Sequence, residues 1–123
     1  MPRERNTYKS QYPFMPLNQI LDFEKDMQDQ KVSKVSRSRG FLKRYKEVQG
    51  DKDKMGYVKN ISYTQKWVHR RESFIKRHLA QVIKRDEPLY NIQGQPTRRT
   101  LAFYAWAFDP SPRQTRKARL KRR

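Results

Sequence analysis

Two histidines are the residues in this chain whose chemistry could most readily serve catalysis or metal binding. His69 and His78 are nine residues apart, and a helix, at ~100° per residue, places them on opposite sides, so they cannot share a metal ion. His69 and Glu72 would share one face at the i, i+3 spacing, but no third ligand is evident near them. His78 falls within an apolar stripe and is expected to be a core residue with one satisfied hydrogen bond. We therefore expect no metal site.

Other catalytic arrangements are also missing from the sequence. Asp86 and Glu87 are adjacent at the end of an expected helix, so their carboxylates diverge and do not form an acid–base pair. There is no glycine-rich phosphate loop, P-loop lysine or nucleophile elbow. The lack of cysteine excludes a disulfide framework and the zinc modules that use cysteine. The sequence predicts a protein that is not an enzyme and that uses no cofactor.

Charge is the strongest signal in the composition. The chain has 123 residues with 30 Lys and Arg against 12 Asp and Glu, a formal net charge of +18. Such an excess indicates an anionic partner, which could be nucleic acid, an acidic protein or a membrane surface, although a solvated basic surface is the alternative. No run of about 18 apolar residues is present, so we expect no transmembrane segment. Hydrophobic residues make up 34%, below the usual ~45–50%, which predicts a small core with long flanks.

The stretch from Ser62 to Glu87 predicts one long amphipathic helix. Ser62 and Gln65 have the spacing of a capping box, and Pro88 cannot continue the helix. The apolar half of the wheel, which would face a core, holds Trp67, Phe74, Ile75, His78, Leu79, Val82 and Ile83. The basic half, which could track phosphates, holds Lys66, Arg70, Arg77 and Lys84. Arg71 instead points into the apolar stripe, where we expect it to stack on Trp67 or to pair with an acid from elsewhere.

Two shorter helices are expected beside the long one. Residues 38–50 place Phe41, Leu42, Tyr45 and Val48 on one side, with Gly50 as the stop. Residues 97–109, capped by Thr97, are ambiguous because their aromatics favour a strand and their alanines a helix. We predict a helix, because a lone strand would have no partner. This stretch would be the centre of the core or a contact surface for another protein.

The segments on either side of this unit predict extended arms. Residues 1–17 contain three prolines with aromatics among them, which would anchor on a neighbour or remain a disordered tail. Residues 18–30 are acidic and allow a short helix that would mask the chain's own basic surface or touch a basic neighbour. The tail after residue 108 has seven basic residues and one acid. The predicted organisation is therefore an arm at 1–35, a helical core at 36–110 and a basic tail at 111–123.

Candidate contact residues follow from these patterns. The residues expected to contact nucleic acid or another anion are Lys66, Arg70, Arg77, Lys84, Arg98, Arg99, Arg113, Arg116, Lys117, Arg119, Lys121, Arg122 and Arg123. The aromatic residues expected to contact protein are Tyr8, Tyr12, Phe14 and Phe103. Contacts to phosphates would make binding sensitive to salt and indifferent to base sequence.

Three sequence blocks carry a family resemblance. They are SRGFLKRYK at 38–46, WVHRRESFIKRHLAQ at 67–81 and PTRRTLAFYAWAFDP at 96–110. Together they resemble a family of small, basic, uncharacterised proteins of large double-stranded DNA viruses. The resemblance implies a compact helical unit without catalytic residues and a place in virus particles, where basic minor proteins join capsid units or contact packaged DNA.

Together these features predict an all-α protein with a small three-helix unit and extended basic N- and C-terminal arms. The expected function is that of a non-enzymatic structural or assembly protein, a minor capsid or virion component that bridges other subunits and neutralises anionic surface. The alternative is a sequence-independent nucleic-acid-binding protein, either a ribosomal-type RNA binder or a DNA-condensing virion protein. It would then reside in a ribosome or another nucleoprotein particle, or in the virion.

Overall fold

The computed structural model describes residues 6–7, 12–32, 41–51, 57–58, 63–113 and 115–121. Its helices are α1 (Leu17–Leu21), α2 (Glu24–Asp29), α3 (Phe41–Glu47), α5 (Tyr63–Arg85), α6 (Arg98–Ala105) and α7 (Arg116–Lys121), with the 3-10 turn η1 (Ser111–Arg113). Two short strands, β1 (Asn6–Thr7) and β2 (Tyr57–Val58), form one antiparallel pair. The expected helical character is confirmed. None of the described helices is long and apolar enough to cross a membrane.

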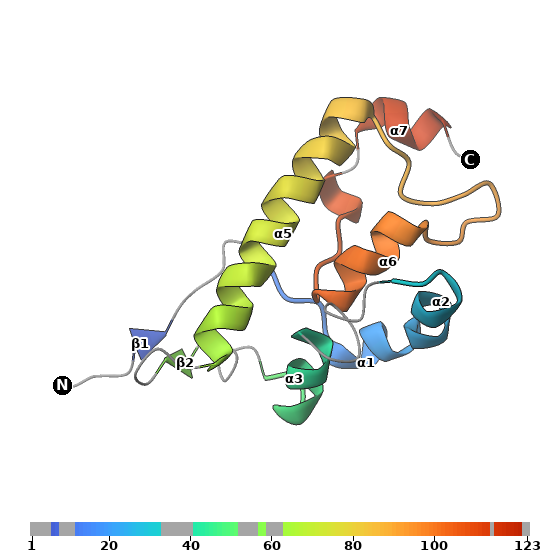
Figure 1. Ribbon diagram of the computed structural model, residues 1–123. Helices are drawn as coiled ribbons and strands as arrows, with labels where there is room; N and C mark the ends of the chain where they lie inside the picture. Colours follow the sequence, from blue (N-terminus) through green and yellow to red (C-terminus); the bar gives the residue numbers. More distant parts are fainter. Residues whose placement is uncertain are drawn as a thin grey trace.

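Helix α5 is the longest element and runs along one side of the molecule (Figure 1). Its inward face contributes Ile75, Leu79 and Val82, which pack with Phe103 of α6 and with the following Phe108. A second cluster joins α6 to the three short helices before it. That cluster contains Ile20, Met27, Phe41, Leu42, Tyr45, Leu101, Tyr104 and Trp106. Helix α6 belongs to both clusters, so of the two roles foreseen for this stretch the structure gives it the centre of the core.

Four helices, α2, α3, α5 and α6, are followed by a residue with a positive φ, and the last three end before the glycine or proline that the sequence suggested as their stop. The residues after their caps, Lys31, Gln49, Asp86 and Ala107, have positive φ values of 58°, 57°, 48° and 58°. In each case the next amide bonds back to a carbonyl five residues earlier, as Phe108 N does to Phe103 O at 3.0 Å. These are Schellman motifs, which turn the chain sharply and satisfy the last carbonyls of the helix. The helices expected at 38–50, 62–87 and 97–109 are shorter for this reason.

Both segments beside the core contain helices. The acidic segment, where one short helix was expected, forms two, α1 and α2, because the chain turns at Asp22 and Phe23. The basic tail contains α7, whose first turn is capped by Thr115, since its hydroxyl oxygen accepts from Ala118 N at 3.1 Å. Ala118 is fully buried, so over these residues the tail is a packed helix and is not extended.

The start of α6 is fixed by the segment that follows α5. Thr97 is the N-cap, as expected, and its side chain accepts from Thr100 N. Thr100 is itself buried and donates its hydroxyl to Leu89 O at 2.7 Å, while Thr97 N donates to the same carbonyl at 3.0 Å. Between Leu89 and Thr97 the chain makes a tight turn in which Gly94 has φ 81°. This link holds α6 against the end of α5.

Candidate functional site

Arg71 is the most unusual side chain in the structure, because it is a fully buried arginine. It lies on the inward face of α5 and donates hydrogen bonds to four carbonyl oxygens. Nε reaches Trp106 O at 2.6 Å, and Nη2 reaches Ala107 O at 2.8 Å. On the other side Nη1 reaches Tyr12 O at 2.9 Å and Nη2 reaches Pro13 O at 2.8 Å. One guanidinium thus joins the N-terminal segment to the turn that ends α6.

The surroundings of Arg71 act on its charge in opposite directions. Its guanidinium carbon lies 3.9 Å from the centre of the Phe14 ring, a cation–π contact. Burial lowers the pKa of Arg71 to about 9, with Tyr45 and Glu72 acting in the opposite direction. The group is therefore still a cation at neutral pH. The sequence predicted that Arg71 points inward and stacks on Trp67 or pairs with an acid from elsewhere. Its inward position is confirmed, and it lies over the ring of Phe14. The side chain of Trp67 lies outside the described residues, so the predicted stacking on Trp67 stays a prediction.

A second polar cluster ties the end of α5 to the start of α6. Arg99 Nε lies 2.6 Å from Glu87 Oε1, and Arg99 Nη1 lies 2.8 Å from His78 Nδ1 and 3.0 Å from Gln81 Oε1. Since Arg99 can only donate, His78 accepts at Nδ1 and is neutral when this bond is made. Burial, Arg99 and Arg77 lower the pKa of His78, and Glu87 opposes them. This cluster explains the expected hydrogen bond of His78, and it engages Arg99 inside the protein.

The outward face of α5 carries the exposed cations. Arg70, Arg77 and Lys84 are all exposed, and their spacing of seven residues puts them on one side of the helix, ~10.5 Å apart. Lys76 is exposed on the other edge of this face. The residues between the two edges are small, Ser73 and Ala80, and both are exposed. We call this surface, from Arg70 to Lys84, the α5 basic face.

The other predicted anion contacts are divided between exposed, engaged and undescribed positions. Arg98 is exposed but donates to Gln30 O and Lys31 O, both at 2.9 Å, which holds α6 to the end of α2. Arg113, Arg116 and Lys117 are exposed on η1 and α7. The side chains that lie outside the described residues are those of Lys66, Arg119, Lys121, Arg122 and Arg123. The structure therefore does not gather all the predicted cations on one surface.

Of the aromatics predicted to contact protein, Tyr12 and Phe103 are buried within the chain itself, which contradicts their prediction as contacts. Phe103 is fully buried between α5 and α6 and is not accessible to a partner. Tyr12 is buried against Phe108, with ring centres 5.5 Å apart. Phe14 is half-buried and packs on Phe41, Tyr45 and Arg71. Tyr8 lies outside the described residues. The segment read as an aromatic arm is anchored to the core from Tyr12 onward.

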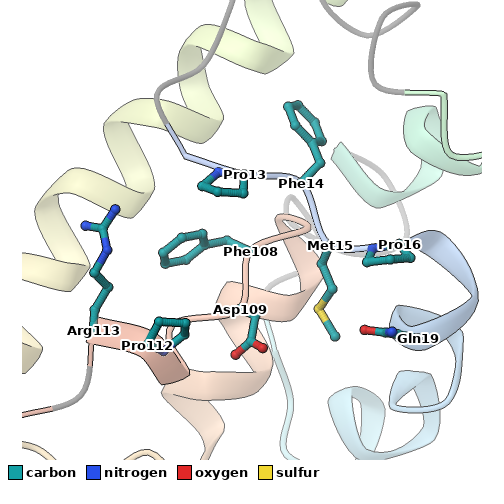
Figure 2. Close-up of a pocket in the computed structure, with 9 residues that line it drawn as sticks. All are labelled: Pro13, Phe14, Met15, Pro16, Gln19, Phe108, Asp109, Pro112 and Arg113. Atoms are coloured by element: carbon teal, nitrogen blue, oxygen red, sulfur yellow. The ribbon is translucent and has the colours of Figure 1, made fainter.

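A half-open pocket lies between the two segments that Arg71 joins. Its volume is about 260 Å³, and its walls come from residues 13–16, Gln19 of α1, and residues 108, 109, 112 and 113. Figure 2 shows Pro13, Met15 and Pro16 on one side, with Phe108, Pro112 and Arg113 on the other. Gln19 and Asp109 supply polar groups. No pattern in the sequence pointed to this pocket, because it depends on contacts between residues almost 100 positions apart.

Neither metal binding nor a known relative adds to this description. Among the described residues there is no group of three or more His, Cys, Asp or Glu side chains that could hold a metal ion. Comparisons of the chain with protein-family models, curated proteins and solved structures find no match. The resemblance to a viral family therefore remains a prediction, and function has to be inferred from the surfaces themselves.

Proposed function

We propose that this protein is a non-enzymatic structural protein that binds the phosphate backbone of nucleic acid through the α5 basic face. The observation that carries the proposal is the row of Arg70, Arg77 and Lys84 exposed along one side of the 23-residue helix α5. The row spans ~21 Å along the helix, a length over which one strand of duplex DNA presents about six phosphates. The small Ser73 and Ala80 at its centre leave room for a backbone to approach.

Two further features support nucleic acid as the partner. The net charge of +18 favours rapid, salt-sensitive association with a polyanion and disfavours a monomer without one. The aromatic residues that could have anchored a protein neighbour, Tyr12 and Phe103, are buried in the core. Affinity would come from charge neutralisation and would show little preference for base sequence, because side chains on this face can reach phosphates without entering a groove.

A second candidate is a minor capsid or virion component that bridges subunits of a large particle. It is favoured by Ile92, which is 73% exposed at the turn between α5 and α6 and could pack on a protein neighbour. The three sequence blocks that resemble a viral family suggest the same setting. In this arrangement the helical unit would sit between capsid subunits and its basic segments would neutralise packaged DNA. A ribosome or another nucleoprotein particle is the alternative location.

The decisive experiment is binding of the full chain to mixed-sequence duplex DNA and to duplex RNA between ~50 and 200 mM salt. We expect affinity to fall by ~10²-fold or more and equally for all sequences, since the four cations of the α5 basic face would contact about four phosphates. The double variant Arg77→Ala, Lys84→Ala should make the slope of log affinity against log salt shallower by about 2. The control Lys25→Ala, Lys43→Ala removes the same charge from exposed positions on α2 and α3 and should leave most of the slope.

Two results would contradict the proposal. Weak or no binding at ~150 mM salt would indicate that the positive charge contacts an acidic protein surface instead of nucleic acid, and would favour the capsid candidate. Equal effects of the two double variants would mean that net charge alone matters and that the α5 basic face is no specific contact.

A further inference from the structure

The pocket between residues 13–16 and 108–113 has no role in the contact proposed above. Its two walls are held in a fixed relation. Arg71 donates hydrogen bonds to Tyr12 O and Pro13 O, at the start of the first wall. It also donates to Trp106 O and Ala107 O, which directly precede the second wall. Met15 N also donates to Ala107 O at 2.6 Å, which joins the walls directly. A ligand would therefore enter a site that is already formed, and little binding energy would be lost in ordering it.

Size limits what the pocket can take. At about 260 Å³ it lies below the ~300–1,000 Å³ of sites for drug-sized ligands, so it suits a single ring system rather than a whole cofactor. Its exposed walls are the apolar rings of Pro13, Pro16 and Pro112, and its floor includes Met15 and Phe108. A planar group could lie between these apolar walls.

The polar groups at the pocket have a definite chemistry. Asp109 is exposed, and one of its oxygens, Oδ1, accepts from Ser111 N at 3.0 Å, which keeps the carboxylate in place. A carboxylate can only accept hydrogen bonds, so it favours a ligand with an amino group on its edge. Gln19 can both donate and accept. Arg113, at the mouth, begins a run of exposed cations that continues with Arg116 and Lys117, and this run suits the phosphates of a strand whose base enters the pocket.

We propose that this pocket takes one unpaired base of single-stranded nucleic acid, with preference for a base that carries an exocyclic amino group. The base lies against the proline rings, its amino group donates to Asp109, and Arg113 contacts the adjacent phosphate. Cytosine offers its N4 amino group to such a carboxylate, whereas thymine and uracil present carbonyl oxygens at the same edge and are disfavoured. This inference rests on the proposed affinity for nucleic acid and adds a second contact to it.

The test compares binding of short oligo-dC and oligo-dT strands by fluorescence anisotropy at one salt concentration, with duplex DNA measured alongside. The wild-type chain should bind oligo-dC at least about fivefold more tightly than oligo-dT. Asp109→Asn should abolish that preference while keeping an oxygen for Ser111 N. Asp26→Asn, the same change at an exposed site on α2, should leave the preference intact. Arg113→Gln should weaken both oligonucleotides equally and make the salt slope shallower by about 0.7.

The outcomes separate the two proposals. Equal binding of oligo-dC and oligo-dT, with duplex binding intact, would overturn the base pocket alone and leave the cavity to an apolar side chain of a protein partner. A preference for oligo-dC without duplex binding would support the pocket and overturn the role of the α5 basic face. Binding to none of the three at ~50 mM salt would overturn both. Circular dichroism of each variant confirms that it is folded.

Discussion

The guanidinium of Arg71 lies over the ring of Phe14, 3.9 Å from its centre, in the interior of the protein. Phe14 belongs to a proline-rich segment that would be a free arm if composition alone decided its structure. The carbonyls of the two residues before it, Tyr12 and Pro13, accept hydrogen bonds from the same guanidinium. Arg71 therefore converts this segment into a part of the core, and it does so without a regular element on the other side of the contact.

Replacement of Arg71 should be costly even when the positive charge is kept. Arg71→Lys retains a cation, but an ammonium cannot donate in four fixed directions, so we expect a loss of about 2 kcal/mol or more in the free energy of unfolding. Arg71→Ala should cost more, about 3–5 kcal/mol, since buried carbonyls lose their donors and a cavity opens. Chemical denaturation measures both. Arg70→Lys, at the neighbouring exposed position, should stay within about 0.5 kcal/mol. An Arg71→Lys protein as stable as the wild type would mean that the fixed directions of the guanidinium N–H groups are unimportant for stability.

Two glycines offer a matched test of packing against backbone strain. Gly50 and Gly94 have similar positive φ values, 75° and 81°, but a Cβ at Gly50 would lie 2.9 Å from Leu17 Cβ, whereas nothing lies within 4 Å at Gly94. Gly94→Ala should therefore cost about 1 kcal/mol from backbone strain alone. Gly50→Ala should cost about 1–3 kcal/mol more, because α1 must shift away from α3. Equal losses in thermal or chemical denaturation would show that α1 is not held closely there.

The amphipathic pattern was sufficient to find the main elements of the core. Hydrophobic spacing places Ile75, Leu79 and Val82 on the inward side of a long helix, and the structure buries these residues, whereas Ile83, assigned to the same half, is exposed. Thr97 was predicted as the N-cap and is the N-cap in the structure, because a threonine hydroxyl at the start of a helix can accept a hydrogen bond from an unpaired backbone N–H of the first turn. The helical choice for the aromatic stretch after it was confirmed as well, since its alanines and this cap outweighed the β-propensity of its aromatics.

What pattern could not supply were contacts between distant residues and unmarked helix ends. Glycine usually takes the left-handed position after a helix, but here that position is held by Lys31, Gln49, Asp86 and Ala107. The residue types at these turns therefore did not predict where the helices end. The carbonyls held by Arg71 carry no side-chain signature at all. The one signal in the sequence was an arginine within the apolar stripe of a helix. It indicated that Arg71 has a hydrogen-bonding or stacking partner inside the protein, but it did not show that this partner is a set of backbone carbonyls.

The lowered pKa of His78 makes stability depend on pH. Burial, Arg99 and Arg77 lower it below the ordinary value of 6.5, so the unfolded chain takes up this proton more readily than the folded one. The stabilisation is complete above pH ~6.5 and is lost as pH falls below that value. The melting temperature should therefore decline from pH 7.5 to 5, and His78→Asn, which keeps an acceptor for Arg99, should flatten that decline. A flat wild-type profile would contradict the assignment.

The left-handed residue after α5 allows the chain to be stabilised. Asp86 has φ 48° and follows the last turn of the helix, where an L-residue is strained and a negative charge opposes the helix dipole. Asp86→Gly removes both penalties and should raise the free energy of unfolding by about 1 kcal/mol, despite the greater freedom of glycine in the unfolded chain. Gln49→Gly makes the same backbone change after α3 without altering charge, and should gain about half as much. A gain at Asp86 alone would assign the effect to charge, whereas a loss at both positions would mean that these two turns do not have the left-handed conformation in solution.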